Sequence, residues 1–231
     1  MKPYEISQNC TRLNEHYPNP DLFKDVLKKM KEKEMEWFIR LWLSEGIPKA
    51  FINNPMLYEL IRDDLAKNIG IIHPKEITIV GSARIGYSLS PDEYEYGSAF
   101  DYESDFDFSI VSSVLYDKLV KEFNTWKSEY KNGDITPKSS VQESYWEKNL
   151  NKHIPHQIKW NFIDSNLICE YYPITISINR ALENFRKRLK NTDFEGQANR
   201  TKKIRIYKNW KAFIDHRLFS IKKLKEELKN S

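Results

Sequence analysis

Apolar residues recur at helical spacing along most of the chain. Before residue 70 the spacing predicts one long helix over about residues 21–44 and a second from Asn54 to Gly70. Asparagine commonly caps a helix, and glycine commonly ends one. The Ser140-x-x-Glu143 pattern is a capping box, which marks another helix start. The later helices are expected over about 114–130, 140–152, 175–189 and 209–231.

Short runs rich in β-branched and aromatic residues separate these helices and predict strands. The runs are Ile77–Val80, Phe106–Val111, Gln157–Ile163 and Ile204–Tyr207. Loose alternation of strands and helices favours an α+β (mixed α/β) architecture with a small sheet flanked by helices. The length allows one domain or two small ones. We expect one, with a core over about 54–210, a helical extension over 1–53 and a basic helix over 209–231.

The second predicted strand carries two carboxylates in an apolar setting. Side chains alternate between the two faces of a strand, so Phe106 and Phe108 point one way and Asp105 and Asp107 the other. Neighbouring carboxylates on one face repel each other unless a cation lies between them. Mg²⁺ or Mn²⁺ prefers such oxygen ligands and also takes substrate phosphates. The alternative is a strand face that simply points into solvent.

A glycine and a serine follow the first predicted strand. Gly81 allows the backbone to approach a phosphate closely, and Ser82 can donate a hydroxyl hydrogen bond to it. Arg84 has the charge and geometry of a phosphate ligand, although it can equally form a surface ion pair. The turn therefore predicts a phosphate site close to the carboxylate pair.

The order of these motifs resembles the nucleotidyltransferase superfamily, whose fold is that of DNA polymerase β. The family pattern is an apolar residue followed by Gly-Ser, then Asp-x-Asp, which correspond here to Val80–Ser82 and Asp105–Asp107. The longer string GSARIGYSLSPDEY…SDFDFSIVS looks like a bacterial branch of that superfamily. Arg205–Trp210 looks like a later element of the same branch. The resemblance spans roughly residues 35–225, and its specific part is about 30 residues long.

The resemblance implies Mg²⁺-dependent transfer of a nucleoside monophosphate from an NTP to RNA, a protein or a small molecule. Gly81 and Ser82 would bind the triphosphate, and Asp105 and Asp107 would hold the metal. Many active members carry a third carboxylate on a later strand, and residues 203–207 contain none. We expect Asp164 to supply it, with Glu170 as the alternative. Without a third acid, the same fold would serve as a nucleotide-binding or regulatory module without turnover.

The gap between the two motifs is unusually long for this family. It holds 22 residues between Ser82 and Asp105. Its acidic, aromatic segment PDEYEYGSAFDYE is expected to form a loop over the site. Stacking on a nucleotide base is one role for its tyrosines and for Tyr87. The tyrosines considered are Tyr87, Tyr94, Tyr96 and Tyr102. The aromatic residues at 37, 38, 42, 210 and 213 have helical spacing, so we expect them in the core.

Charge is distributed unevenly along the chain. The net charge is +4, but residues 184–231 hold 15 Lys and Arg against 5 Asp and Glu. That basic segment fits either RNA or partner binding or a solvated helix end. The chain has two cysteines without CxxC spacing, no apolar run of membrane-spanning length and no apolar leader at its N-terminus, so we expect a cytoplasmic protein that does not enter a membrane. We expect His153 and His156 in a loop as unrelated residues, since Pro155 separates them.

Overall fold

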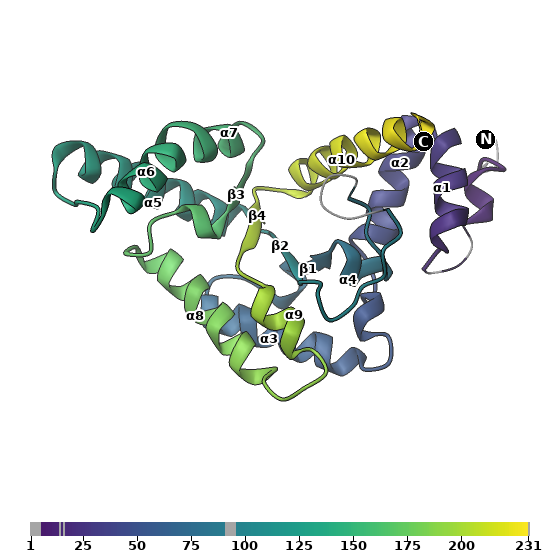
Figure 1. Cartoon of the computed structure of the whole chain (residues 1–231), viewed down its shortest axis with the longest axis horizontal. Helices are drawn as coiled ribbons and strands as arrows, with labels where there is room; N and C mark the ends of the chain where they lie inside the picture. Colours follow the sequence, from purple (N-terminus) through teal and green to yellow (C-terminus); the bar gives the residue numbers. More distant parts are fainter. Residues whose placement is uncertain (1–5, 14, 16, 91–95, 231) are drawn as a thin grey trace.

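A computed structural model describes residues 6–13, 15, 17–90 and 96–230, and its centre is a four-stranded mixed sheet (Figure 1). The strands are β1 (Ile77–Val80), β2 (Asp107–Val111), β3 (Phe162–Asp164) and β4 (Ile204–Tyr207). They lie in the order β1-β2-β4-β3. β2 runs parallel to β4, while β1 and β3 are antiparallel to their neighbours. The predicted α+β architecture is confirmed.

Helices surround this sheet and make up most of the structure. In the described part of the chain the α-helices are α1 (Pro20–Lys29), α2 (Glu32–Phe38), α3 (Pro55–Ile69), α4 (Ser82–Ile85), α5 (Ser113–Asn132), α6 (Ser140–Lys148), α7 (Ile154–Lys159), α8 (Pro173–Arg188), α9 (Glu195–Arg200) and α10 (Trp210–Asn230). One π-helical turn, Ile39–Leu43, continues α2, and another, Asn149–His153, joins α6 to α7. Among the described residues, no helix combines the length and apolar composition of a membrane span.

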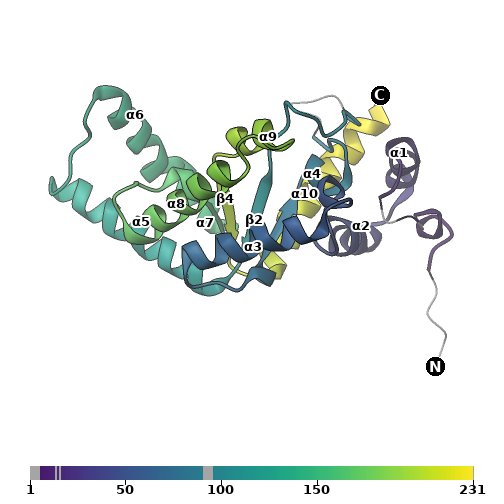
Figure 2. The ribbon, with the colours of Figure 1, turned by 90° about the horizontal axis from the view of Figure 1, so that it is seen from below.

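Each face of the sheet packs against its own hydrophobic core. One face carries Ile79, Phe108 and Ile206 and is covered by α3, α5 and α8. The other carries Val80, Val111 and Tyr207 and packs against α1, α2 and α10. Figure 2, seen from below, shows α3 and α8 crossing in front of the strands with α10 behind them. Because successive side chains of a strand point to opposite faces, the apolar residues of these short strands contribute to both cores.

Two predicted elements are wrong in their extent. The helix expected over 21–44 is interrupted at Met30, whose ψ of 138° is extended, so α1 and α2 are separate helices. The Nζ of Lys225 in α10 donates to the Met30 carbonyl at 2.5 Å, so tertiary contact satisfies the interrupted backbone. The strand expected from Gln157 is helix α7 as far as Lys159, and β3 begins only at Phe162.

The same region corrects the expectation for the two histidines. His153 ends a π-helical turn and His156 lies in α7, so neither is in a loop. Pro155 is accommodated because it occupies the first turn of α7, where its missing N–H is not needed. The predicted cap residue also moves by one, since Ser139 and not Ser140 accepts the hydrogen bond that begins α6.

The aromatic residues expected in the core divide into two groups. Phe38 and Phe213 are buried as predicted, and Trp42 is half-buried. Trp37 and Trp210 are 42% and 47% exposed, so the core prediction is wrong for them. Helical spacing defines a stripe but not its edges, and both tryptophans lie at the border of their helix stripes.

Candidate functional site

The candidate site lies where the paired strands β1 and β2 meet the Gly81 turn. Val80 is the register partner of Asp107, so Gly81 follows directly beside that carboxylate. Gly81 has φ 71° and ψ −155°, a region that is essentially open only to glycine. A Cβ at this position would collide with Asp107 Oδ2 and lie 3.3 Å from its Cγ. The predicted phosphate turn and the second aspartate are therefore in direct contact.

Alternation along β2 sets the direction of the two aspartates. Phe106 and Phe108 are buried in the core on the α8 side, so Asp107, the first residue of β2, belongs to the α10 side of the sheet, while Asp105 precedes the strand. Asp105 is exposed and Asp107 is half-buried. The Asp107 carboxylate makes no hydrogen bond or ion pair with another described residue. For Asp107 this agrees with the strand face predicted from the sequence, and for Asp105 the face stays a prediction.

Helix α9 holds the segment that enters β2. Thr201, just after α9, accepts the Phe106 N–H at 3.0 Å through its buried hydroxyl. Arg200 donates to the Tyr102 carbonyl at 3.0 Å and forms an ion pair with Glu103. Gln197 donates to the Asp101 carbonyl at 2.9 Å. Contacts far apart in sequence thus fix the loop before Asp105.

The residues after Gly81 have different surroundings. Ser82 begins α4 beside Gly81, is half-buried and makes no hydroxyl hydrogen bond with another described residue. Arg84 is only 1% exposed, and it donates from Nε to the Trp42 carbonyl at 3.1 Å and from Nη1 to the Gly46 carbonyl at 2.8 Å. The expectation that Arg84 faces a phosphate beside Ser82 is not met, because backbone carbonyls occupy its guanidinium.

Asp164, the residue expected to complete the acidic set, lies on the same face of the sheet but at a distance. The register places it opposite Arg205, which in turn pairs with Ser109. Asp164 is therefore two strands away from Asp107 and offset by two residues along the strand direction. This offset corresponds to a separation of about 12 Å between the Cα atoms of Asp164 and Asp107. Arg205 takes both carboxylate oxygens, with Nε and Nη2 at 2.6 and 2.8 Å. In this conformation Asp164 holds an arginine.

Electrostatics agree with this geometry. Burial by itself would raise the pKa of Asp164, but the hydrogen bonds and positive charge of Arg205 outweigh it and lower that pKa below its ordinary value. Gln157 adds hydrogen bonds to both the side chain and the backbone of Asp164. A carboxylate held in this way stays ionised and is a weak proton acceptor.

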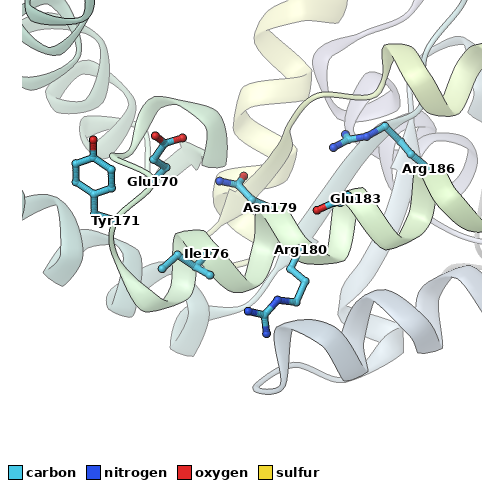
Figure 3. Close-up of a pocket in the computed structure, with 7 residues that line it drawn as sticks. All are labelled: Glu170, Tyr171, Ile176, Asn179, Arg180, Glu183 and Arg186. Carbon is cyan, nitrogen blue, oxygen red and sulfur yellow. The ribbon is translucent and has the colours of Figure 1, made fainter. Parts of the chain in front are cut away.

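Glu170, the alternative third acid, lies elsewhere. It lines a groove of about 540 Å³ along α8. Figure 3 shows its side chain near those of Tyr171 and Asn179. Because α8 covers the sheet face opposite to that of Asp107, Glu170 does not join the aspartate pair. No group of three His, Cys, Asp or Glu side chains suited to a metal occurs among the described residues. Two carboxylates remain, a number that suits Mg²⁺ when substrate phosphates supply further ligands.

The long segment between the motifs folds back beside α4. The Phe100 N–H donates to the Gly86 carbonyl at 2.9 Å, and the Ser88 N–H donates to the Ser98 carbonyl at 2.8 Å. Tyr87 is buried, which argues against base stacking, whereas Tyr102 is 63% exposed. Tyr96 donates its hydroxyl to the Pro20 carbonyl, and Tyr94 lies outside the described residues. The part of the predicted loop over 91–95 is likewise outside them.

Arg205 is the residue whose importance sequence reasoning missed. Ile204 and Ile206 face the α8-side core, so Arg205 must face the aspartate side of the sheet. That alternation is visible in the sequence, but the pairing of β4 between β2 and β3 is not.

Comparison of the chain with protein-family models, curated proteins and solved structures finds no match.

Proposed function

We propose that this chain is a Mg²⁺- or Mn²⁺-dependent nucleotidyltransferase of the DNA-polymerase-β-like superfamily. It would move a nucleoside monophosphate from an NTP to RNA, a protein or a small molecule. The observation that carries the proposal is the contact between Gly81 and the Asp107 carboxylate. It brings the glycine-serine turn together with Asp107, the second residue of the Asp-x-Asp motif, at one sheet edge, which supports the proposal.

Each residue of this edge has a role in the proposed transfer. Gly81 gives the triphosphate room to approach the backbone, and the Ser82 hydroxyl donates to a phosphate oxygen. Asp105 and Asp107 hold the cation, which neutralises charge on the phosphates when bound. The acceptor hydroxyl oxygen bonds to the α-phosphorus and gives up its proton to water. The bond from the α-phosphorus to the oxygen that bridges it to the β-phosphate breaks, and pyrophosphate leaves with that oxygen. Positioning and charge stabilisation are the main contributions of the protein.

The test is transfer of label from α-phosphate-labelled NTPs in Mg²⁺ to the protein itself, to RNA or to small hydroxyl compounds. The double variant Asp105→Asn plus Asp107→Asn should lose roughly a hundredfold or more of the transfer, since even outer-sphere changes cost 10–100-fold. The matched control is Asp117→Asn plus Asp134→Asn, two exposed aspartates outside the site. Equal transfer by wild type and the site variant would reject the proposal.

A second candidate is a nucleotide-binding or regulatory module of the same fold without turnover. It is favoured by Arg205, a cation on the strand beside β2 where the family pattern has an acid. Arg205 also forms an ion pair with Asp164, so that carboxylate is not available as a third acid in this conformation. This candidate predicts that NTP raises the melting temperature of the protein without release of pyrophosphate. Steady pyrophosphate release that depends on the aspartate pair would exclude it.

A further inference from the structure

A second pocket lies at the opposite end of β1 from Gly81. It measures about 560 Å³ and is bordered by Ile77 and Thr78 at the start of that strand, by the segment after the π-helical turn, by α3 and by α10. This volume is within the range of about 300–1,000 Å³ that small-molecule sites occupy. It shares no lining residue with the candidate site formed by Gly81, Ser82, Asp105 and Asp107, which we call the aspartate edge. It therefore requires its own interpretation.

Cations from three separate elements line this pocket. Arg40 comes from the π-helical turn, Arg62 from α3 and Lys75 from the turn before β1. Glu45 is the acidic residue in the lining. Arg62 pairs with Glu59 of the same helix, Arg40 has only a distant carboxylate, Glu36 at 4.0 Å, and Lys75 has no ion pair with another described residue. Within the lining itself three cations stand against one carboxylate, and Lys75 is the cation left to an incoming anion.

The wall of the pocket adds a buried charge. Arg84 lies behind Gly46, a lining residue, and donates to its carbonyl at 2.8 Å. It is 1% exposed and forms no ion pair with any described residue. Buried charges are normally paired, because leaving water is costly. The unpaired guanidinium raises the positive potential of the pocket and would be stabilised by an anion there.

Aromatic side chains accompany this charge. Tyr58 lies buried against Arg62, whose guanidinium carbon is 4.6 Å from the ring centroid. Trp210, at the first turn of α10, is 47% exposed and forms a T-shaped pair with Phe213 at 5.4 Å between centroids. Its remaining surface offers a planar platform of the kind on which nucleobases stack.

We propose that this pocket binds a phosphate-bearing molecule with a planar ring, such as a nucleoside monophosphate. Arg62 and Lys75 would hold the phosphate, and the ring would stack on Trp210. The groove along α8 does not offer this chemistry, because its two arginines alternate with Glu170 and Glu183 (Figure 3). The proposal needs no metal and is independent of nucleotide transfer at Asp105 and Asp107.

The test measures binding of AMP and of inorganic phosphate by calorimetry in the presence of EDTA. Arg62→Gln plus Lys75→Gln should weaken AMP binding by about tenfold or more, since charge-assisted hydrogen bonds are strong. Trp210→Ala should weaken AMP but leave phosphate unchanged. Lys67→Gln, an exposed change on the same helix α3, is the matched control and should bind like wild type.

The variant Asp105→Asn plus Asp107→Asn separates this pocket from the aspartate edge and should bind AMP in EDTA like wild type. Loss of binding in that variant would overturn the proposal, as would undiminished binding in Arg62→Gln plus Lys75→Gln. Absence of AMP binding by wild type at millimolar concentration would also overturn it. If the double substitution fails to fold, Lys75→Gln alone must show weaker binding, because Lys75 is exposed and its loss leaves the core intact.

Discussion

Gly81 carries both a backbone constraint and a steric one. Its φ of 71° and ψ of −155° suit glycine, and its missing side chain leaves room for the Asp107 carboxylate. Gly133 has a similar φ of 79°, but a Cβ there would meet nothing within 4 Å. The two glycines therefore allow the steric contact to be separated from a simple left-handed turn.

We expect Gly81→Ala to lower the free energy of unfolding by about 2–3 kcal/mol, because strain and collision with Asp107 add together. Gly133→Ala should cost only about 1 kcal/mol. Urea denaturation at neutral pH measures both. Equal losses would mean that the Asp107 side chain moves away freely and that the close approach is not a constraint.

The Asp164–Arg205 pair raises a different question at the residue scale. Asp164 was expected to act as a base, but its oxygens bind Arg205, and its side chain is only 8% exposed. Removing one partner of a buried pair leaves the other charge unsatisfied. Stability and turnover therefore respond differently to substitution, depending on which role Asp164 has.

We expect Asp164→Asn to lower the free energy of unfolding at neutral pH by about 3 kcal/mol or more. The loss should shrink as pH falls through the lowered pKa of Asp164, since the wild-type carboxylate is then protonated as well. Glu183→Gln, which breaks an exposed pair with Lys187, should leave stability nearly unchanged. If the folded fraction of Asp164→Asn loses its nucleotide transfer entirely, Asp164 is the base after all.

At the scale of elements, one hydrogen bond links α10 to the sheet. Tyr207 at the end of β4 lies 2.8 Å from His216 Nδ1 in α10, and the imidazole also packs on Phe162 of β3 at 4.6 Å between centroids. Burial, followed by the charges of Arg205 and Arg217, lowers the pKa of His216 to about 3. The helix is thus attached through a neutral histidine.

Because unfolded histidine titrates near 6.5, the unfolded state binds a proton before the folded state does, and stability falls as pH drops from about 6.5 toward 3. By about pH 5 the loss should approach 2 kcal/mol. His216→Phe keeps a ring but cannot titrate, so it should be less stable than wild type near pH 7.5 and approach wild type near pH 5. Urea unfolding at both pH values checks this, and parallel pH profiles would contradict it.

Element prediction succeeded where local signals sufficed. α3 begins after Asn54 and ends at Gly70, as its cap residues predicted, and β1, β4 and the start of α10 also agree. The break at Met30 and the helical course of α7 were missed. The residues next to Met30 include no glycine or proline that would end a helix. The Met30 carbonyl accepts a hydrogen bond from Lys225, which is 195 residues away in the sequence. Long-range contacts of this kind are invisible to periodicity.

At the scale of the whole molecule, part of the charge of the basic C-terminal segment, residues 184–231, is held in ion pairs. Lysines of α10 pair with acids in the same helix or in α2. The pairs are Lys211–Asp215, Lys222–Glu32, Lys223–Glu227 and Lys229–Glu226. Such exposed pairs contribute little to stability, but they weaken the local attraction to phosphates. RNA or partner binding through this segment stays a prediction to be tested.

We expect the protein to retain a single-stranded RNA probe only at low salt, with binding lost by about 0.2 M salt, because few phosphates would be contacted. The variant Asp105→Asn plus Asp107→Asn should bind the same probe equally well. Filter binding across a salt series measures this. Tight binding that resists salt would contradict it and revive an RNA-binding function for α10.

The sequence by itself determined the α+β class, the strand that begins at Asp107, and the glycine before Ser82. These follow from period-two alternation and from the backbone freedom of glycine, which are local properties. Only the tertiary structure decided that Gly81 touches Asp107, that Arg84 is buried and that Asp164 is bound to Arg205. Those outcomes depend on strand order and register, and the order β1-β2-β4-β3 places β2 beside β4, a strand more than 90 residues later in the chain.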